Sequence, residues 1–501
     1  MFDPPPAAEY EAERAQAEEL ALNFDDATTA LKSKSTWELL RAYGVLQLCA
    51  VPFIVANGRV MYDTSRRILG GSITDKLVDL TFFGHFCGGV DEPALQPVLT
   101  RMRSLGVGAI LDYAAENDVA SEKKSDRHDE VVSARTYDYV NEQICDINAN
   151  MVMNAIDAAA NALKGDRVEF AAMKVTAFGK PELLERCSDV IRCLQVAFTT
   201  LDSDVDGMLS PDEIRNGFKE LKVQMSEEEM DALLVKMDFD QNGMIDFTEF
   251  MDALSPLDEA MAPLFTSAIS PLYADKIDAL EKGEIEQLMS MVQRLGKVAA
   301  HANEKGVSLM IDAEQTYMQP AIDQCALTLM RKYNKKRAVI LNTYQCYTRD
   351  SFQRVRADVD RSTLYGYVFG AKIVRGAYMI QERRLAEQKG YPDPIQPDLE
   401  STHRNYDAVS AFILGFKSSG GEDSLRSKTL LMVASHNESS VKSTVALMAS
   451  LGLGKDSGVC FGQLRGMCDH VSLSLGDAGY WVYKVTLTPQ PSLPLSLEPD
   501  T

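Results

Sequence analysis

Eight short β-rich apolar runs, alternating with longer segments of helical spacing, are the feature that most constrains the fold of this 501-residue chain. The runs between Val168 and Gly462 are continuously apolar, as in strands that are buried on both faces of a parallel sheet. Eight strands with intervening helices predict a distorted (β/α)₈ barrel of the TIM type. An open doubly wound sheet is the alternative, and the strand count favours the barrel. The runs are 108–113, 168–177, 306–312, 338–344, 368–374, 429–435, 458–462 and 480–485.

One interval is far too long for a single connecting helix. Nearly 130 residues lie between Ala177, at the end of the second run, and Gly306, at the start of the third. An inserted all-α domain accounts for this excess. The predicted organisation is an N-terminal helical arm at 1–105, a first barrel part at 106–189, the insert at 190–262, a second barrel part at 263–485 and a Pro-rich irregular tail at 486–501.

The insert contains two segments, 202–213 and 238–249, with the ligand pattern of an EF-hand loop. Calcium takes about six to eight oxygen ligands around a loop with glycine at its sharp turn. The loops start 36 residues apart, which leaves room for an exit helix, a linker and an entry helix. Two complete loops at this distance exclude chance acidic turns. The predicted ligands are Asp202, Asp204, Asp206, Met208 (through its carbonyl) and Glu213, and then Asp238, Asp240, Asn242, Met244 (through its carbonyl) and Glu249.

The composition limits the function further. The formal net charge is −22 and the pI is about 4.8, so the surface repels phosphate backbones and nucleic-acid binding is not expected. Nine scattered cysteines indicate reduced thiols in an intracellular compartment.

The start of the chain shows no transit peptide, so either the protein is cytosolic or this start lacks a leader. The apolar stretch 45–56 is interpreted as a buried helix, with a membrane-surface helix as the alternative.

Polar side chains interrupt or follow five of the predicted strands, at the ends where such barrels carry their chemistry. A charged group in an apolar strand needs a partner or an anionic ligand. A structural salt bridge would explain any single case, but agreement among five strands indicates a site for an anionic cofactor and a zwitterionic substrate. No Gly-x-Gly-x-x-Gly motif follows a strand, which disfavours a nicotinamide-linked dehydrogenase. The residues are Lys174, Asp312, Asn342, Gln345, Lys372, Arg375 and His436.

The segments around these residues resemble the mitochondrial proline dehydrogenase (proline oxidase) family. They include Asp-Ala-Glu-Gln-Thr-Tyr-Met-Gln-Pro from Asp312, Phe-Gly-Ala-Lys-Ile-Val-Arg-Gly-Ala-Tyr from Phe369 and Phe-Gly-Gln-Leu-Arg-Gly-Met-Cys-Asp from Phe461. The resemblance covers roughly 35–485 outside the insert. It implies a flavoenzyme that oxidises L-proline to Δ1-pyrroline-5-carboxylate, transfers hydride to FAD and passes electrons to ubiquinone. It also implies a peripheral association with the matrix side of the mitochondrial inner membrane.

The resemblance also assigns roles to individual residues. It places Lys174 and Asp312 beside the substrate and the flavin, and Leu464 in the wall of the proline pocket. Lys372 takes the place of the family's basic residue near the reactive flavin edge, where a cation stabilises the charge that reduction creates. The other expected cofactor contacts are Val374, Gly376, Ala377 and Tyr378 along the flavin, with His436 and Asn342 or Gln345 as hydrogen-bonding partners.

The match to the family stops at Lys484, and this departure leaves two hypotheses open. In the family, the next segment is a helix whose Arg-Arg pair binds the proline carboxylate. Arginine suits this task because its planar guanidinium group can donate two parallel hydrogen bonds to a carboxylate. No such pair is present after Val485 in this sequence. The leading hypothesis is a proline dehydrogenase modulated by calcium, because the insert lies between the strands of Lys174 and Asp312. The competing hypothesis is a calcium-binding pseudoenzyme whose barrel lacks the substrate clamp.

Overall fold

The structure is a computed structural model that describes residues 22–488, apart from 90–91, 114–116, 120–133, 137–138, 162–166, 221–222, 224, 256, 258–281 and 422. The start of the predicted arm, the end of the insert and most of the Pro-rich tail therefore lie outside the described residues. None of the helices in the described part of the chain is long and apolar enough to cross a membrane.

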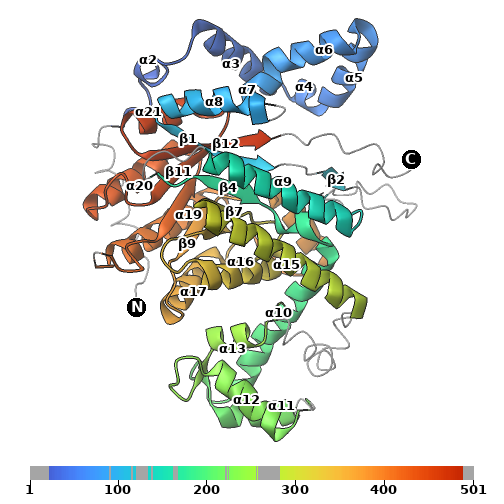
Figure 1. The fold of residues 1–501 in the computed structure, drawn as a ribbon, viewed down its shortest axis with the longest axis vertical. Coiled ribbons are helices and arrows are strands. Elements are labelled where there is room, and N and C mark those ends of the chain that lie inside the picture. Colours follow the sequence, from blue (N-terminus) through green and yellow to red (C-terminus); the bar gives the residue numbers. More distant parts are fainter. Residues whose placement is uncertain are drawn as a thin grey trace.

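A closed barrel of eight parallel strands confirms the predicted (β/α)₈ fold (Figure 1). The order around the barrel is β1-β12-β11-β10-β9-β8-β7-β4, and each strand overlaps one of the eight predicted runs. A separate two-stranded sheet pairs β2 (Asn117–Val119) with β3 (Ala134–Thr136). The barrel strands are β1 (Val107–Tyr113), β4 (Phe170–Met173), β7 (Ser308–Ile311), β8 (Ile340–Gln345), β9 (Gly370–Val374), β10 (Leu430–Ala434), β11 (Val459–Leu464) and β12 (Trp481–Thr488).

The continuous apolar runs are explained by two packed layers. One buried cluster fills the interior of the barrel, and alternate residues of the same strands pack outward against the helices. Inside, the rings of Phe170 and Tyr483 meet edge to face at 4.9 Å. The surrounding helices are α9 (Glu142–Ala160), α10 (Pro181–Leu201), α15 (Lys282–Lys305), α16 (Gln319–Tyr333), α17 (Ser351–Leu364), α18 (Met379–Lys389), α19 (Leu399–Ser418), α20 (Glu438–Ser450) and α21 (Asp469–Asp477).

Helices precede the first barrel strand, as predicted for the arm. A π-helical turn (Asp79–Phe83) continues the fifth of these helices into the sixth. Figure 1 shows them in blue, on the opposite side of the barrel from the insert. The arm helices are α2 (Ala27–Ala30), α3 (Thr36–Cys49), α4 (Pro52–Ala56), α5 (Gly58–Leu69), α6 (Gly71–Val78), α7 (Gly84–Phe86) and α8 (Glu92–Ser104).

The insert contains two helix–loop–helix units, built by α10, α11 (Pro211–Glu220), α12 (Glu227–Met237) and α13 (Phe247–Ala253). The helix α10 runs without a break through the predicted boundary near 190. Its first half packs on the barrel, where the Ser188 hydroxyl donates to the Met318 carbonyl at 3.0 Å. Its second half packs in the insert, where Phe198 contacts the rings of Phe247 and Phe250 at 5.3 and 5.5 Å. One continuous helix therefore joins the barrel to the first predicted EF-hand loop.

Candidate active site and candidate calcium-binding loops

The barrel brings nearly all the predicted cofactor and substrate residues to its carboxyl-terminal end. Lys174 directly follows β4 and Asp312 directly follows β7, while Gln345 and Leu464 are the last residues of β8 and β11. His436 lies two residues beyond β10. The remaining residues lie on β9 or in the connection after it, and they are Lys372, Val374, Gly376, Ala377 and Tyr378.

A buried ion pair crosses the mouth of the barrel. The Lys372 ammonium lies 2.6 Å from Asp312 Oδ1, and the two side chains are only 11% and 16% exposed. Thr343 on β8 lies beside Lys372 in the strand register. Because a buried charge needs a partner, Asp312 supplies the counter-charge that Lys372 requires in this setting. The pair holds a positive charge in a fixed, poorly hydrated place.

A second lysine, Lys174, lies directly after β4, the strand next to β7 in the barrel. Lys174 Nζ donates to the Tyr378 hydroxyl at 2.9 Å and lies 5.6 Å from the centre of that ring. Tyr378 is 7% exposed and begins the turn into α18. The contact ties the loop after β4 to the loop after β9, so Lys174 and Tyr378 fix each other's position.

His436 supports the loop that carries Leu464. The Leu464 amide donates to His436 Nε2 at 2.9 Å. Burial, together with the nearby Lys484 ammonium, lowers the pKa of His436, which agrees with a neutral ring that accepts this bond. A cofactor contact by His436 would therefore use Nδ1. Leu464 itself is 47% exposed and presents an apolar side chain at the mouth.

Asn342 is the one predicted cofactor residue that lies elsewhere. It is on the outer face of β8, where its amide donates to Asp323 Oδ1 at 3.0 Å. Strand alternation instead turns Thr343 and Gln345 inward, and the Gln345 amide donates to the Glu314 carbonyl at 2.7 Å. Of the two alternatives, only Gln345 is at the site.

Buried polar atoms around the mouth test whether a polar cofactor fits. Thr343 Oγ1, the Tyr347 hydroxyl and both amide atoms of Gln315 are buried and have no hydrogen-bond partner among the described residues. Buried donors and acceptors of native proteins are nearly always satisfied. Thr343 lies beside Lys372 in the strand register, and buried polar atoms next to a cation suit a ligand with a polar edge and negative charge, so the residues present fit a flavin. The sequence analysis did not include Thr343 and Gln315. Thr343 lies two residues before Gln345, on the same face of the strand, and Gln315 lies three residues after Asp312, so each could have been found from its neighbour.

The two predicted EF-hand loops of the insert share a glycine turn and pair with each other. Gly207 and Gly243, the sixth residues, have φ of +85° and +83°. A short antiparallel bridge pairs β5 (Met208–Leu209) with β6 (Ile245–Asp246). Met208 and Met244, the predicted carbonyl ligands, directly follow these glycines and donate their amides to Asp206 and Asn242 at 2.8 and 2.7 Å.

The side chains of the loops converge as a cation site requires. Carboxylate oxygens within 4.8 Å of one another come from Asp202, Asp204 and Asp206 in the first loop, and from Asp238, Asp240 and Glu249 in the second. Asp238 Oδ1 is buried without a hydrogen-bond partner in the described chain, so the second loop has an unused ligand oxygen. Glu213 lies outside the first cluster, because hydrogen bonds from Ser203 and Ser210 hold its carboxylate.

Comparison with known proteins identifies the family. A family model described as proline dehydrogenase matches residues 96–490. The chain belongs to the proline dehydrogenase family. It is 36% identical over 516 residues to proline dehydrogenase 1, mitochondrial, of Caenorhabditis elegans, covering 93% of this chain and 82% of that protein. It is 35% identical over 522 residues to the Homo sapiens protein of the same name, with 93% and 83% covered.

The chain is also similar to hydroxyproline dehydrogenases. The chain is 32% identical over 482 residues to hydroxyproline dehydrogenase of Xenopus laevis, covering 96% of this chain and 85% of that protein. Among solved structures, the fold matches proline utilization A from Bdellovibrio bacteriovorus inactivated by N-propargylglycine. The TM-score is 0.56 at 14% identity, and the match covers 98% of this chain and 40% of that longer one. This structural similarity supports the fold.

In this proline dehydrogenase, Gly376 sets the shape of the turn after β9. Its φ is +135°, and a Cβ atom there would lie 2.4 Å from Tyr347 Cδ1. We expect Gly376→Ala to lower the free energy of unfolding by about 1–3 kcal/mol and to reduce the bound flavin. Gly415→Ala is the control, because this helical glycine has no atom within 4 Å of the added methyl group. Urea unfolding should show the control unchanged or slightly stabilised, and equal stability of both variants would contradict the expectation.

Proposed function

We propose that the chain oxidises L-proline to Δ1-pyrroline-5-carboxylate with FAD, passes the electrons to ubiquinone in mitochondria, and is modulated by calcium. The observation that carries the oxidation is the buried Lys372–Asp312 pair at the barrel mouth of a family member. FAD, when bound, supplies the hydride acceptor. The named relatives from Caenorhabditis elegans and Homo sapiens are mitochondrial, which supports the same compartment here.

The chain's own residues have separate tasks in this proposal. Lys372 stabilises negative charge that develops beside it, and Asp312 holds it in place before the reaction begins. The Lys174–Tyr378 contact orients the opposite wall. Leu464 offers an apolar surface to the methylene groups of the proline ring. Gln345, Thr343 and Gln315 offer hydrogen bonds to the cofactor, and contacts such as these would exclude water from the reacting atoms.

Substrate choice is the test of this proposal, since the chain resembles both proline and hydroxyproline dehydrogenases. Steady-state kcat/KM should be measured for L-proline and for trans-4-hydroxy-L-proline with the purified chain and a soluble quinone. We expect L-proline to be preferred by about 10- to 100-fold, because an apolar wall disfavours an added hydroxyl group but cannot reject it more strongly than about that. Preference for hydroxyproline would overturn the proposed substrate.

The proposed calcium sites use the ligands predicted from the sequence. Calcium would bind Asp202, Asp204, Asp206, Glu213 and the Met208 carbonyl in the first loop. In the second it would bind Asp238, Asp240, Asn242, Glu249 and the Met244 carbonyl. The unpartnered, buried Asp238 Oδ1 supports the second site most directly. Burial raises the pKa of Glu249 although amides of Asp246, Asp240 and Phe239 donate to it, so a bound cation would stabilise its charged form.

The second loop contacts the barrel directly, which supports modulation by calcium. The Phe239 ring meets Tyr365 edge to face at 4.6 Å, and the Arg331 guanidinium lies 5.0 Å from the Phe239 ring and 3.8 Å from the Tyr365 ring. On the exit helix α13, Asp252 lies 3.4 Å from Arg361 Nε of α17. The loop and its exit helix therefore rest on α16 and α17 through aromatic and charged groups together.

These contacts continue inward to β8. Arg361 also pairs with Asp358 at 2.6 Å, and Asp358 accepts a 2.8 Å hydrogen bond from the Tyr344 hydroxyl. Tyr344 lies on β8 between Thr343 and Gln345. Asp358, Arg361 and Tyr344 are all buried, and burial raises the pKa of Asp358 to about 6. A continuous set of polar contacts thus links the exit helix of the second loop to the strand that carries the proposed cofactor residues.

Calcium binding would change this interface at a defined atom. Glu249 Oε1 accepts hydrogen bonds from the amides of Phe239 and Asp240, at 2.9 and 3.2 Å. Bidentate ligation of calcium by the last residue of the loop draws both of its oxygens to the ion. The Phe239 backbone would then adjust, and its ring is the one that contacts Tyr365. Coupling between two such sites is typically about 5- to 150-fold in affinity.

Asp252→Asn tests this coupling while leaving the Arg361–Asp358 pair intact. We expect the variant to bind calcium within about threefold of the unmodified chain and to lose most of the calcium dependence of proline:quinone turnover. Asp231→Asn is the control, because Asp231 is 64% exposed and pairs with Arg215 inside the insert. An unchanged calcium response in Asp252→Asn would exclude this route, and a flat response in the unmodified chain would remove calcium modulation.

A further inference from the structure

Two buried carboxylates at the mouth of the barrel hold threonine residues in the same way. Glu314 is 0% exposed, and it accepts hydrogen bonds from the Thr176 amide at 3.2 Å and from the Thr176 hydroxyl at 2.7 Å. Glu382, also 0% exposed, accepts from the amide and the hydroxyl of Thr316, each at 2.6 Å. We call these the Glu314–Thr176 fork and the Glu382–Thr316 fork. Because a buried carboxylate costs free energy unless it is hydrogen-bonded, each glutamate depends on its threonine.

The Glu314–Thr176 fork joins the loop after β4 to the loop after β7. Thr176 lies two residues after Lys174, in the 3₁₀ turn Val175–Phe178. Glu314 lies two residues after Asp312, which directly follows β7. The fork therefore fixes, relative to each other, the two backbone segments that carry charged residues of the proposed active site.

The Glu382–Thr316 fork joins the loop after β7 to α18, the helix that follows β9. The Glu382 amide donates to the Tyr378 carbonyl at 2.9 Å in the first turn of this helix. The Tyr378 hydroxyl in turn accepts the hydrogen bond from Lys174. The two forks and the Lys174–Tyr378 contact thus form a closed ring of contacts through the loops after β4, β7 and β9. None of the three loops can shift without breaking a hydrogen bond of this ring.

The forks also flank a residue that the proposed function assigns to the cofactor. Gln315 lies between Glu314 and Thr316, one member of each fork, and it is 0% exposed. Both of its amide atoms lack a hydrogen-bond partner among the described residues, so its position there depends on the backbone on either side. Arg192 of α10 supports the same loop, because its Nη2 donates to the Thr316 carbonyl at 2.8 Å.

We propose that the members of both forks are positioning residues for the oxidation of proline, because they hold Lys174, Asp312 and Gln315 in the geometry that the reaction needs. This role rests on the proposed function. The fork residues act through these three side chains, whose misplacement by about 1 Å can cost about 100-fold in rate.

Thr176→Val and Thr316→Val test this role, because each removes a fork hydroxyl and keeps the shape of the side chain. We expect each to lower the rate at which saturating L-proline reduces bound flavin, measured anaerobically per flavin, by about 10- to 100-fold. Thr176→Ser and Thr316→Ser keep the hydroxyl and should stay within about threefold of the unmodified chain. The reduction potential of the flavin should not change in any of the four, because none of them alters the charge of Lys372.

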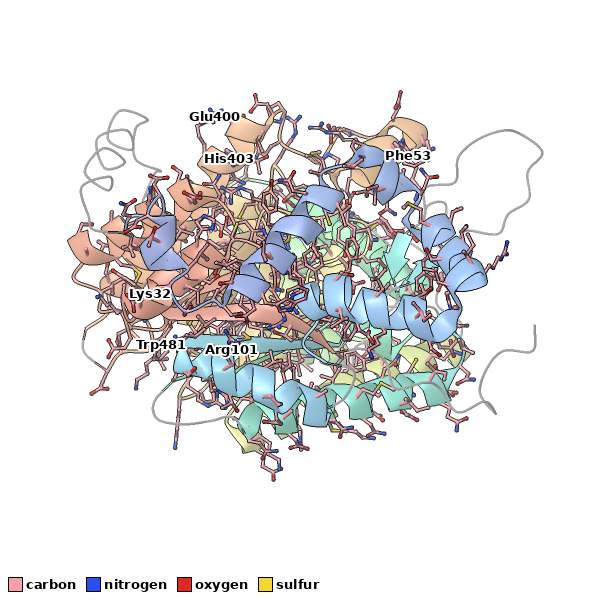
Figure 2. All side chains as sticks on the ribbon, turned by 90° about the horizontal axis from the view of Figure 1, so that it is seen from above. Lys32, Phe53, Arg101, Glu400, His403 and Trp481 are labelled. Atoms are coloured by element: carbon pink, nitrogen blue, oxygen red, sulfur yellow. The ribbon has the colours of Figure 1, made fainter. Side chains whose placement is uncertain are left out.

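Glu169→Gln is the control for a change at a buried carboxylate. Glu169 is 4% exposed and directly precedes β4. It therefore lies at the amino-terminal end of the barrel, the end where Figure 2 labels Trp481, the first residue of β12. Because this position is away from the mouth, we expect an unchanged rate of flavin reduction whatever the effect on stability.

A structural role and a positioning role give different results. Forks that serve the fold alone would lower the Tm of the valine variants and leave the rate per bound flavin unchanged, and this result would overturn the inference. If a valine variant does not fold, Glu314→Gln or Glu382→Gln replaces it with the same expectation, since glutamine keeps the shape and one acceptor oxygen. Absence of flavin reduction by L-proline in the unmodified chain would instead contradict the proposed function itself.

Discussion

Lys372→Met is expected to lower kcat/KM for L-proline by about 100- to 1000-fold, because it removes the cation that we propose stabilises charge developing at the barrel mouth. It also leaves the Asp312 carboxylate without its 2.6 Å partner in a poorly hydrated place. The reduction potential of bound flavin should become more negative, since the reduced, more negatively charged form loses its counter-charge. Anaerobic reduction by proline and spectroelectrochemical titration measure the two effects.

Two further variants separate this role from a merely structural one. Lys372→Arg keeps the charge and should retain more activity than Lys372→Met, although the broader guanidinium does not match the ammonium geometry. Lys389→Met is the control, because Lys389 is 54% exposed and pairs only loosely, at 3.4 Å, with Glu185. Unchanged turnover and potential in Lys372→Met would show that the ion pair serves the fold alone.

Loss of the proposed second calcium site is expected to give the other large effect. Asp238→Asn combined with Glu249→Gln is expected to weaken calcium binding at the second loop by about 100-fold or more, since it removes two of the three converging carboxylates. At a free calcium concentration about 100 times the dissociation constant, binding stabilises the folded chain by about 2.7 kcal/mol. The calcium-dependent rise in Tm should therefore shrink in the double variant.

Calorimetric titration with calcium measures the binding affinity, and thermal unfolding with and without a chelator measures the calcium-dependent rise in Tm. Asp202→Asn with Asp204→Asn in the first loop is the matched comparison, and it should leave binding at the second loop measurable. The Asp231→Asn variant should behave as the unmodified chain. The second loop would not be a calcium site if the Asp238→Asn, Glu249→Gln variant bound calcium as tightly as the unmodified chain.

The strands could be predicted from the sequence because buried parallel strands are continuous apolar runs, and each of the eight runs overlaps a barrel strand. Closure could not be predicted from the count alone, since an open sheet uses the same runs. The pairing of β1 with both β4 and β12 decides between the two. Helix α10 passes through the predicted boundary near 190 because its apolar spacing continues from the barrel into the insert.

The site shows what local pattern can and cannot predict. Lys174, Asp312 and Lys372 are predicted as site residues because each is a charged residue in or directly after an apolar run. The structure brings all three to one end of the barrel. The choice between Asn342 and Gln345 depends on which face of β8 is inward, and a fully buried strand has no polar alternation to reveal it. The Asp252–Arg361 contact joins residues more than 100 positions apart, and no local signal predicts it.

Anaerobic addition of L-proline to the purified chain tests the central proposal most directly. The proposal predicts a yellow protein whose visible flavin absorbance is bleached by L-proline and unaffected by D-proline. A protein that binds flavin but is not bleached by proline would contradict catalysis and favour a calcium-binding pseudoenzyme, and a colourless protein would contradict the cofactor site as well.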